Sequence, residues 1–380
     1  MDDVAIAGGG PAGALAAIIL ARAGVRVRVF DRAVFPRHKL CGDTLNPGAL
    51  AVLARHVDLG AILEQSGAID GMVLTGPGGV SVRGRYPEGL TGRAITRSIL
   101  DHWLLLQAAA SGAQIEEGVA VRDVTSESDA GGGRVAGLRV QGRGPVVTHG
   151  ARMVIAADGR RSSLAFGRGL ARTPARPRRW AIGAYFSGVA GGTTAGEMHV
   201  RAGHYLGVAP MPGGLTNACL VVPHASGDAT GLAPSDLLGR YLRGDSELGP
   251  RFARAMPEAP AVMLGPMAVD TAAAGEPGLL LAGDAAGFID PMTGDGLRLA
   301  LAGAELAANV VLEVFAGRVP LQDAHVLLAR RRRAAFHAKW RFNRALRSLV
   351  ASPYGISAAT ASARALPAVF ERIIRYAGDC

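Results

Sequence analysis

The sequence predicts an α/β fold built from two intertwined parts and a helical C-terminal segment. One part is a parallel sheet covered by helices, and the other is a smaller antiparallel sheet. Three observations predict this fold: a glycine-rich turn between a strand and a helix at residues 4–23, a strand, loop and helix at residues 278–315, and short alternating segments between them. With 380 residues, 49% of them hydrophobic, the chain can bury a sizeable core.

The N-terminal segment has the pattern of a nucleotide-binding βαβ unit. A short apolar strand leads into the motif G-G-G-P-A-G at residues 8–13, and a helix and a second strand follow. Gly8 permits the tight turn, Gly10 lets a pyrophosphate approach the backbone, and Gly13 lets helix and strand pack closely. Asp31 ends the second strand, where its carboxylate can accept ribose hydroxyls. This context favours a dinucleotide over a purely structural turn, without choosing FAD or NAD.

Three later segments would complete the site if they converge on the same dinucleotide. Arg97 opens a helix, where a cation opposes the helix dipole, so it either faces a ligand or is solvated. A strand at residues 152–157 runs into Asp158-Gly159, and a buried strand delivers Gly283-Asp284. The loop that follows opens a long helix at about Leu297, and the N–H groups there favour negative charge.

Short β-rich segments with alternating patterns lie between these pieces. They are expected to form an antiparallel sheet over the dinucleotide, with one face towards a substrate cavity, and residues 129–133 are expected to be a hairpin tip in the first part. The expected strands are residues 72–75, 80–86, 181–189, 197–200, 205–210 and 217–222. We expect the first part to comprise residues 1–68, 97–175 and 268–330, the second 69–96 and 176–267, and the C-terminal helical segment 331–380.

Composition excludes several classes of function. The net charge of +10 comes almost entirely from arginine, since only Lys39 and Lys339 are lysines, and no aromatic-interleaved basic stripe predicts nucleic-acid binding. The scattered Cys41, Cys219 and Cys380 predict neither a disulfide framework nor a metal site. No basic and apolar leader precedes the first strand, so a cytoplasmic location is expected.

Residues 323–347 have the pattern of a basic amphipathic helix, with four arginines at 330–333 and aromatic residues such as Trp340 interspersed. Such a helix can lie on an anionic membrane surface, which would suit a lipid-like substrate. A solvated basic face on a packing helix is the competing interpretation. The sequence leaves both open.

The glycine motif with Asp31, Asp158-Gly159 and Gly283-Asp284 resembles the three-part FAD signature of the para-hydroxybenzoate-hydroxylase-like flavoproteins, over most of residues 1–345. These include aromatic monooxygenases, flavin-dependent halogenases and geranylgeranyl reductases. The resemblance implies a Rossmann-like (GR2-type) FAD-binding domain, with Asp284 on the ribityl chain and residues 291–296 beside the isoalloxazine. It implies FAD contacts from Gly8, Gly10, Pro11, Ala12, Gly13, Asp31, Arg32, Lys39, Cys41, Gly42, Arg97, Val121, Asp158, Gly159, Gly283, Asp284, Pro291, Gly294, Asp295, Gly296 and Leu297.

Two features resemble the geranylgeranyl reductase branch: the Cys41-Gly42 pair, and Gly287 where many hydroxylases carry histidine. Two others differ from it. Prenyl reductases carry Tyr-x-Trp-x-Phe-Pro, whereas here Tyr205 is followed by Gly207 and Ala209 at the bulky positions. Losing two large aromatics would open room over the flavin and suggests a bulkier or differently shaped substrate. The Trp-x-Trp-x-Ile-Pro hallmark of halogenases is absent, and no lysine lies in the equivalent region.

Cys41, Tyr205 and Pro291 are the candidate catalytic residues. Cys41 could be a proton donor, a redox thiol or a small packed residue. Arg37 and Lys39 could pair with FAD phosphates or with an acidic substrate group, or could be solvated. Structural or surface roles are favoured for three lone histidines, His38, His204 and His224.

We therefore expect a flavoenzyme in which NAD(P)H, a transient donor, reduces FAD, and the reduced FAD acts on a hydrophobic isoprenoid- or polyketide-like small molecule. In one chemistry hydride passes to an activated double bond; in the alternative, a flavin hydroperoxide hydroxylates or epoxidises an electron-rich ring. A non-catalytic flavin-binding protein is the alternative from another class. The sequence gives neither the preferred nicotinamide nucleotide nor the oligomeric state, and a monomer is compatible with it.

Overall fold

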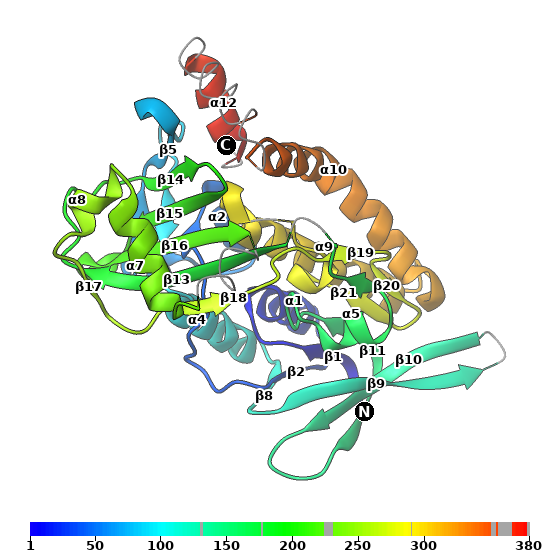
Figure 1. The fold of residues 1–380 in the computed structure, drawn as a ribbon. Coiled ribbons are helices and arrows are strands. Elements are labelled where there is room, and N and C mark those ends of the chain that lie inside the picture. The colour runs from blue at the N-terminus through cyan, green and yellow to red at the C-terminus, as the bar shows by residue number, and fades with distance from the viewer. Residues whose placement is uncertain are drawn as a thin grey trace.

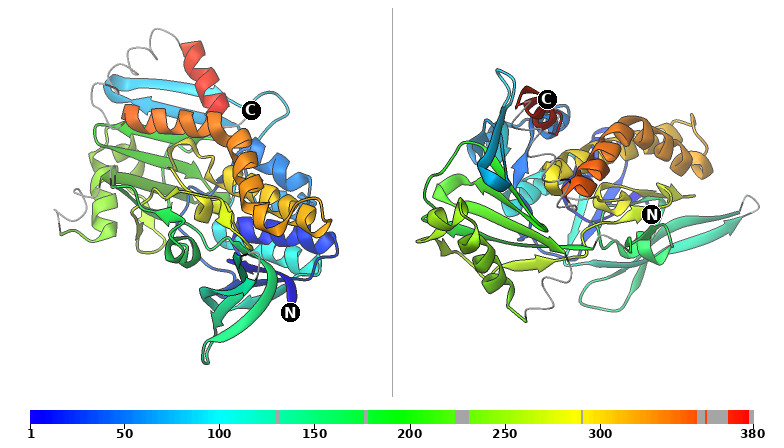
Figure 2. Two further views of the ribbon diagram at one scale, coloured as in Figure 1. Left: turned by 90° about the vertical axis from the view of Figure 1, so that its right-hand side faces the viewer. Right: turned by 45° about the horizontal axis from the view of Figure 1, so that its top comes forward.

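A computed structural model describes residues 1–129, 132–175, 178–223, 231–289, 291–350, 355 and 367–377. The two expected sheets lie beside each other, and the long helix α10 (Ala324–Val350) runs along the molecule past both of them (Figures 1 and 2). The prediction of a mixed α/β fold with a second sheet and a helical C-terminal segment is confirmed. None of the described helices combines the length and the apolar character that crossing a membrane requires.

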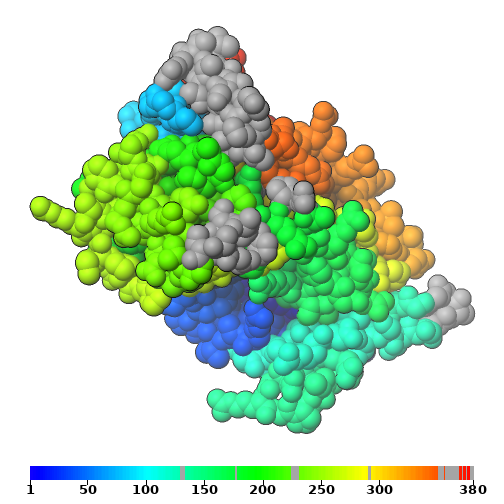
Figure 3. All heavy atoms as spheres, in the orientation of Figure 1, coloured from blue at the N-terminus to red at the C-terminus, as the bar shows by residue number. Residues whose placement is uncertain are grey.

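The first sheet is mainly parallel. In the described residues its strands lie in the order β20-β21-β11-β1-β2-β8, and every neighbouring pair except β20 and β21 runs parallel. β9 and β10 form an antiparallel ribbon that joins the sheet at β11 and projects from the body of the molecule (Figure 3). The strands are β1 (Asp2–Ala7), β2 (Val27–Asp31), β8 (Gln114–Glu117), β9 (Ala120–Asp129), β10 (Gly132–Gln141), β11 (Val147–Ala156), β20 (Gly275–Glu276) and β21 (Leu279–Leu281).

Apolar layers cover both faces of this sheet, which explains why β1, β11 and β21 are continuous apolar runs. On one face α1, α4 and α9 pack around fully buried side chains such as Leu15 and Leu104. On the other face, the β9–β11 strands and α5 enclose a second core around Leu138 and Leu164. The helices here are α1 (Pro11–Arg22), α2 (Pro47–Ala54), α3 (Gly60–Glu64), α4 (Arg97–Ala110), α5 (Ser163–Gly167) and α9 (Gly296–Phe315).

The second sheet has the strand order β17-β13-β16-β15-β14-β5-β6, with β18 also on β13. Its pairs are antiparallel except β14 with β5, which is parallel. The expectation of a wholly antiparallel sheet is wrong at that pair, because β5 enters from an earlier segment and the long connection allows parallel pairing. The strands are β5 (Gly71–Gly76), β6 (Val80–Arg85), β13 (Arg179–Ser187), β14 (Gly196–Arg201), β15 (His204–Pro210), β16 (Thr216–Pro223), β17 (Met256–Pro257) and β18 (Val262–Leu264).

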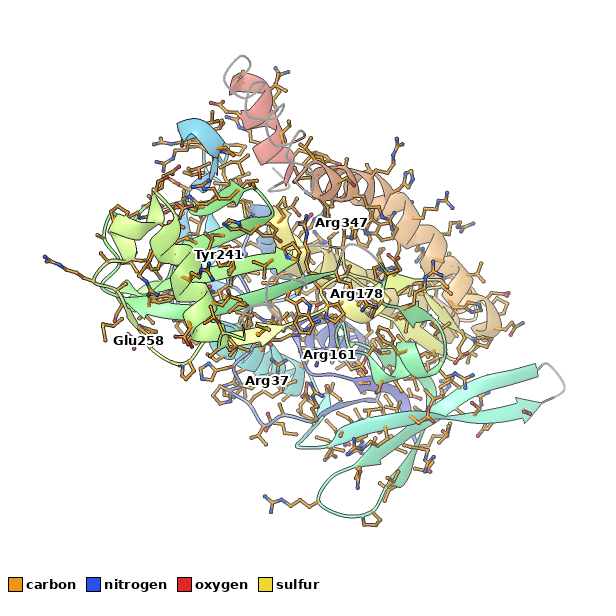
Figure 4. The ribbon with its side chains drawn as sticks, viewed as in Figure 1. Arg37, Arg161, Arg178, Tyr241, Glu258 and Arg347 are labelled. Atoms are coloured by element: carbon orange, nitrogen blue, oxygen red, sulfur yellow. The ribbon has the colours of Figure 1, made fainter. Side chains whose placement is uncertain are left out.

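Short elements join the two parts. β3 (Thr44–Leu45), β4 (Gly67–Ile69) and β7 (Gly92–Ala94) form a small sheet, and β12 (Ala171–Arg172) pairs with β19 (Asp270–Thr271). The arginines after β11 also cross between the parts: Arg160 Nη1 donates to Pro266 O at 2.8 Å and Arg161 Nη2 to Gly265 O at 2.6 Å. Arg161 and Arg178, labelled in Figure 4, lie along this junction.

The two faces of the second sheet differ in their cover. Ile182, Leu206 and Leu220 point to the outer face, where α7 (Pro234–Gly244) and α8 (Leu248–Phe252) cover them. Because side chains alternate along a strand, the residues between them point to the opposite face, towards the first part. We call this the inner face; it carries Ala181, Gly183 and Tyr185 of β13, Asn217, Cys219 and Val221 of β16, and Tyr205, Gly207 and Ala209 of β15.

The C-terminal segment does not begin where expected. α10 runs unbroken from Ala324 to Val350 across residue 331, the expected boundary. The interpretation of a solvated basic face on a packing helix holds for Arg330, Arg333, Arg341 and Arg344, which are exposed, but not for Arg332 and Lys339, which are 7% and 4% exposed. α12 (Pro367–Ala377) lies against β6, where Tyr376 O accepts a hydrogen bond from Lys339 Nζ at 2.6 Å (Figure 2).

A buried ionic network attaches α8 to the second sheet. The Glu197 carboxylate, 5% exposed, accepts hydrogen bonds from Arg251 Nη1 at 2.6 Å and Nη2 at 2.9 Å, and His199 Nε2 lies 2.9 Å from it. His199 Nδ1 in turn contacts Thr75 Oγ1 at 2.9 Å. Burial opposes ionisation of Glu197, but the hydrogen bonds from His199 and Arg251 outweigh it and lower its pKa to about 2.

We predict that Glu197→Gln lowers the free energy of unfolding by about 3 kcal/mol at pH 6, because it leaves the Arg251 charge without its partner. The folded-state pKa of Glu197 is depressed, so its contribution is present above the unfolded value of 4.5 and is lost as the pH falls towards about 2. The difference between wild type and variant in urea unfolding should therefore shrink from pH 6 to pH 3. Glu258→Gln, at an exposed carboxylate, is the control; a pH-independent difference would contradict the prediction.

Candidate active site

Three loops leave the first sheet at the same edge. β1, β11 and β21 are parallel neighbours, so the residues after Ala7, Ala156 and Leu281 meet there. Ala157 N donates to Ala7 O at 2.7 Å, and Ala282 N donates to Ala156 O at 2.8 Å. The three stretches that sequence reasoning placed around one dinucleotide are therefore adjacent in space, at the position where α/β sheets bind their ligands.

The glycines in these loops differ in what their missing side chains allow. Gly8 has φ +101°, and a Cβ there would overlap the carbonyl oxygen of Ala157. A Cβ at Gly13 would overlap the carbonyl oxygen of Gly8, so these two glycines permit contact between β1, α1 and β11. A Cβ at Gly10 would meet only Arg37 Nη2, at 3.5 Å. The backbone at Gly10 is therefore open to a ligand.

Helix N-termini supply the anion-binding groups. α2, α4 and α5 are each capped by a side chain, from Asn46, Thr96 and Ser162. α1 and α9 have no side-chain cap, and their first turns carry Gly13 and Leu297. The N–H groups at these two helix ends remain available to a phosphate or another anionic group.

The three acids behind the loops occupy different environments. Asp31 accepts from Gly9 N and Ala33 N, each at 2.8 Å, and so orders the first glycine turn. Asp158 Oδ2 accepts from Ser163 N at 2.9 Å, whereas Asp158 Oδ1 is buried without a partner among the described residues; burial raises the pKa of Asp158. Burial lowers the pKa of Lys39 and of Arg160, and the nearby charge of Asp284 opposes this lowering in both.

Arg97 is the centre of a buried charge cluster at the start of α4. It is 5% exposed and forms a bidentate pair with Asp101, at 2.7 and 2.8 Å, so the interpretation of a solvated arginine is wrong. Asp101, fully buried, also pairs with Arg37 Nη2 at 3.1 Å, which joins the loop before Cys41 to α4. Burial raises the pKa of the Cys41 thiol, and the nearby charge of Arg97 opposes this rise. Lys39 Nζ lies 3.7 Å from the position of a Cβ on Gly159.

The loop after β21 is held from behind by α10. It contains η3 (Gly283–Ala286) and η4 (Pro291–Thr293). Arg332 Nη2 donates to Ala286 O at 2.8 Å, and burial lowers the pKa of Arg332 to about 10. At the other end of the loop Asp295 accepts from Asn343 Nδ2 at 3.1 Å and lies 3.5 Å from Lys339 Nζ. α10 thus fixes the loop that leads into α9.

The loop of residues 35–43 lies on the inner face of the second sheet. A Cβ at Gly183 would lie 2.5 Å from Leu40 Cδ1 and 2.7 Å from Cys219 Sγ, so the loop rests on a position without a side chain. Cys41 O accepts from Asn217 Nδ2 at 2.8 Å and from Cys219 Sγ at 3.4 Å. Burial raises the pKa of the Cys41 thiol, which therefore carries its proton at neutral pH.

Asp43, at the end of this loop, is fully buried and has φ +53°. Its Oδ2 accepts from the Tyr185 hydroxyl and from Asn217 Nδ2, the latter at 2.9 Å. Its Oδ1 has no partner among the described residues. Burial raises the pKa of Asp43 to about 7 against the opposing hydrogen bond from Tyr185 and the charge of Arg97. We call Asp43, Tyr185 and Asn217 the Asp43 corner.

The positions expected to open the substrate cavity have different surroundings. A Cβ at Gly207 would have only Cys219 O and Met198 Cε nearby, both at 3.9 Å, so this position has room. Ala209 is 6% exposed and Tyr205 2%, so both are packed. Tyr205 belongs to an apolar cluster with Met198 and Met292 and forms part of its wall. A catalytic role for Tyr205 stays a prediction.

The remaining predicted residues lie around the same loops. Arg32 and Gly42 are exposed, Val121 O accepts from Ser163 Oγ at 3.4 Å, and Gly294 has φ +67° with an open Cβ position. Pro291 opens η4, but its side chain lies outside the described residues, as do Asp290, His224 and Cys380. His204 contacts Tyr241 edge-on at 4.6 Å, and His38 is exposed. Roles for these residues stay predictions.

Sequence reasoning missed three groups of residues. Tyr185 and Asn217 come from strands whose pairing depends on tertiary structure, although their alternation marks the face they share. Asp101 lies four residues after Arg97, a spacing that predicts a helical ion pair. The α10 contacts of Arg332, Lys339 and Asn343 gave no such signal, since these residues lie within a generally basic helix.

The site as built fits FAD. The open backbone at Gly10, the uncapped N-termini of α1 and α9, and the unpartnered Asp158 Oδ1 are features that a flavin dinucleotide would use. Gly10 and Gly13 would hold the pyrophosphate, Asp31 the adenosine ribose and Asp284 the ribityl chain. The loop before α9 would lie beside the ring system.

Comparison with known proteins agrees with this assignment. Residues 1–216 match the FAD binding domain family. A menaquinone reductase from Mycolicibacterium smegmatis is 32% identical over 81% of this chain and 76% of its own length. A digeranylgeranylglycerophospholipid reductase from Methanopyrus kandleri is 28% identical over 82% and 80%. The myxobacterial chondrochloren halogenase has a TM-score of 0.81 at 23% identity, over 90% of this chain and 81% of its own.

The chain belongs to the FAD binding domain family and is an FAD-dependent oxidoreductase. Within the para-hydroxybenzoate-hydroxylase-like flavoenzymes its relatives include geranylgeranyl reductase-like proteins, in line with its Cys41-Gly42 pair. NAD(P)H as electron donor is typical of these enzymes. The predictions of a flavoprotein and of FAD as cofactor are confirmed.

Gly10 and Gly13 should respond differently to a single methyl group. Gly13→Ala should lower the melting temperature and abolish FAD binding, because its Cβ overlaps a backbone oxygen that cannot move independently. Gly10→Ala should keep the melting temperature of the FAD-free protein but weaken FAD binding about tenfold, since the methyl occupies the approach to the backbone. Melting curves and FAD titration by fluorescence test both. Unchanged FAD affinity in Gly10→Ala would place the pyrophosphate elsewhere.

Proposed function

We propose that this oxidoreductase reduces an activated double bond in a hydrophobic isoprenoid- or polyketide-like molecule, with NAD(P)H as the electron donor. The observation that carries the proposal is a row of small residues on the inner face of the second sheet. Gly183, Cys219 and Gly207 are paired across β13, β16 and β15, directly where the loop of Cys41 lies against the sheet.

Apolar side chains border this row on one side. The next residues along the same strands, Ala181, Val221 and Tyr205, pack with Met292 and Phe288 from the loop before α9. A substrate lying over Gly207 would therefore contact mainly apolar surface and stay out of water. This supports a hydrophobic substrate. The names of the two reductase relatives, menaquinone reductase and digeranylgeranylglycerophospholipid reductase, support it as well.

Polar groups that carry protons border the row on its other side. The Asp43 corner and the protonated Cys41 thiol lie there. FAD, when bound and reduced, supplies a hydride, and saturation of a double bond also requires one proton. An apolar floor with proton donors at one end suits this chemistry better than a uniformly apolar cavity.

Product analysis tests the proposal directly. The flavin-loaded enzyme with NADH or NADPH and a short-chain menaquinone or geranylgeraniol, without oxygen, should give a product whose isoprenoid chain gains two hydrogens. A product that gains one oxygen, formed only in air, would replace reduction by monooxygenation. If neither NADH nor NADPH bleaches the flavin in the presence of any probe, a non-catalytic flavin-binding protein would be favoured.

The row of small residues makes a mutational prediction. Gly207→Trp should raise KM for a long-chain substrate about tenfold or more, because the indole would fill the space over the floor. Gly207→Ala is the matched control, since its Cβ neighbours at 3.9 Å are at ordinary contact distance. Steady-state kinetics with short- and long-chain substrates measure the effect. Equal kinetics of Gly207→Trp and wild type would remove Gly207 from the cavity.

A further inference from the structure

We infer that Tyr185 delivers the proton in this reduction and that Asp43 behind it resupplies that proton. The inference rests on the proposed function and names residues that no comparison assigns. It is carried by the Asp43 corner: a buried carboxylate in a strained backbone conformation, bonded to a half-buried phenol beside the row of small residues.

The geometry of Asp43 is costly, and its backbone contacts do not account for the side chain. An Asp with φ +53° adopts the left-handed region, which non-glycine residues rarely occupy. Asp43 O accepts from Ile95 N at 2.9 Å, which fixes the backbone but leaves the carboxylate uninvolved. One carboxylate oxygen, Oδ2, accepts hydrogen bonds from Tyr185 and Asn217. The other, Oδ1, is buried without a partner among the described residues. An unpartnered buried acceptor is a cost that a protonated carboxyl reduces.

Tyr185 connects this carboxyl to the substrate side. It lies two residues from Gly183 on β13, so both side chains point to the inner face. Its partner across the strand pair is Asn217, which holds both Cys41 O and Asp43 Oδ2. The phenol is half-buried whereas Asp43 is fully buried, so Tyr185 is the member of the pair that a substrate can reach.

The charges around Asp43 set the state of its proton. Arg97 and Asp101 face it from α4, Tyr185 from β13, Cys219 from β16 and Cys41 from its own loop. Arg97 is largely neutralised by its pair with Asp101, so burial dominates and raises the pKa of Asp43 to about 7. Burial and the charge of Asp43 raise the pKa of Tyr185, so the phenol stays protonated at neutral pH until the substrate takes its proton.

The proton balance closes within this pair. The hydride, two electrons and one hydrogen, comes from the NAD(P)H-reduced cofactor and forms a C–H bond at one carbon of the double bond. The other carbon takes the Tyr185 proton as its π electrons form the second C–H bond. When Asp43 is neutral, its carboxyl O–H donates to the Tyr185 oxygen and the phenolic proton is directed at the substrate, the reverse of the bond made to the carboxylate. The carboxyl then gives its proton to the Tyr185 oxygen and becomes a carboxylate, which regains a proton from solvent between turnovers.

Cys41 lacks such a resupply. Its thiol is buried near the charge of Arg97, a group that holds its own proton firmly. Its carbonyl contacts the Asp43 corner, through Asn217. Tyr185 is therefore the donor that touches substrate, and Asp43 acts through it.

Two variants test the inference in the flavin-loaded enzyme. Asp43→Asn keeps a residue that tolerates positive φ, and Tyr185→Phe keeps the ring. Infrared difference spectroscopy should show a neutral carboxyl band that disappears with a midpoint near pH 7, is absent in Asp43→Asn and titrates at a shifted pH in Tyr185→Phe. Tyr86→Phe, which removes a phenol from the same apolar cluster, should leave the band unmoved. A carboxylate ionised throughout pH 5 to 8 would overturn the inference.

Single-turnover reduction of the short-chain menaquinone or geranylgeraniol tests the role. The rate should fall as pH rises through about 7 in wild type, because the neutral carboxyl is required. Tyr185→Phe should be about a hundredfold slower, and Asp43→Asn should be slower and lose this pH dependence. If product still forms with an unchanged pH profile in both variants, or if Cys41→Ala alone removes it, the pair is not the donor. If no probe gains two hydrogens even in wild type, the proposed function has failed, and the inference falls with it.

Discussion

The contact between Leu40 and Gly183 is the constraint on which the rest of the site depends. Because β13 has no side chain at this position, the loop of residues 35–43 can lie directly on the second sheet. From there Arg37 reaches Asp101 on α4, Cys41 O reaches Asn217 and Asp43 reaches Tyr185. One loop thereby fixes the position of the first sheet relative to the second. A larger residue at Gly183 would separate the two parts by displacing the loop, and would disturb the contacts of Arg37, Cys41 and Asp43 together.

Much of the dinucleotide site could be predicted from the sequence, because the residues that form it are constrained by neighbours along the chain or by the ends of parallel strands. Gly13 is required by the carbonyl oxygen of Gly8 within the same strand–turn–helix, Gly8 has the positive φ of the tight turn, and the parallel strands deliver Asp158 and Asp284 to one edge. The inner face of the second sheet was harder to predict, because the pairing of β13 with β16 brings together Tyr185 and Asn217 from distant segments. The prediction of an antiparallel sheet missed the parallel pairing of β14 with β5 for the same reason: alternation gives the face of a strand but not the direction of its neighbour.

Two buried cations are where the C-terminal helix departs from the expected solvated basic face. A sequence pattern treats Arg332 and Lys339 as surface charges, because desolvating a cation is costly unless a partner compensates. Here the partners come from the loop between β21 and α9. Ala286 O accepts from Arg332, and Asp295 lies beside Lys339 and also accepts from Asn343. Arg332 also lies over the rings of Phe336 and Trp340, at 5.6 and 5.8 Å. Such buried charges add little net stability but strongly penalise other arrangements of the loop, so they specify its position.

Three features that are unfavourable to folding occur together at Asp43. Asp43 combines a left-handed backbone, complete burial and an unpartnered carboxylate oxygen, and each of these features is unfavourable to folding. Asparagine would tolerate the same φ and could satisfy the neighbouring oxygen and nitrogen atoms without a charge. What asparagine cannot do is exchange a proton near neutral pH. An aspartate kept under these conditions, beside a phenol on the substrate face, is more readily explained by the chemistry of its proton than by its contribution to the fold.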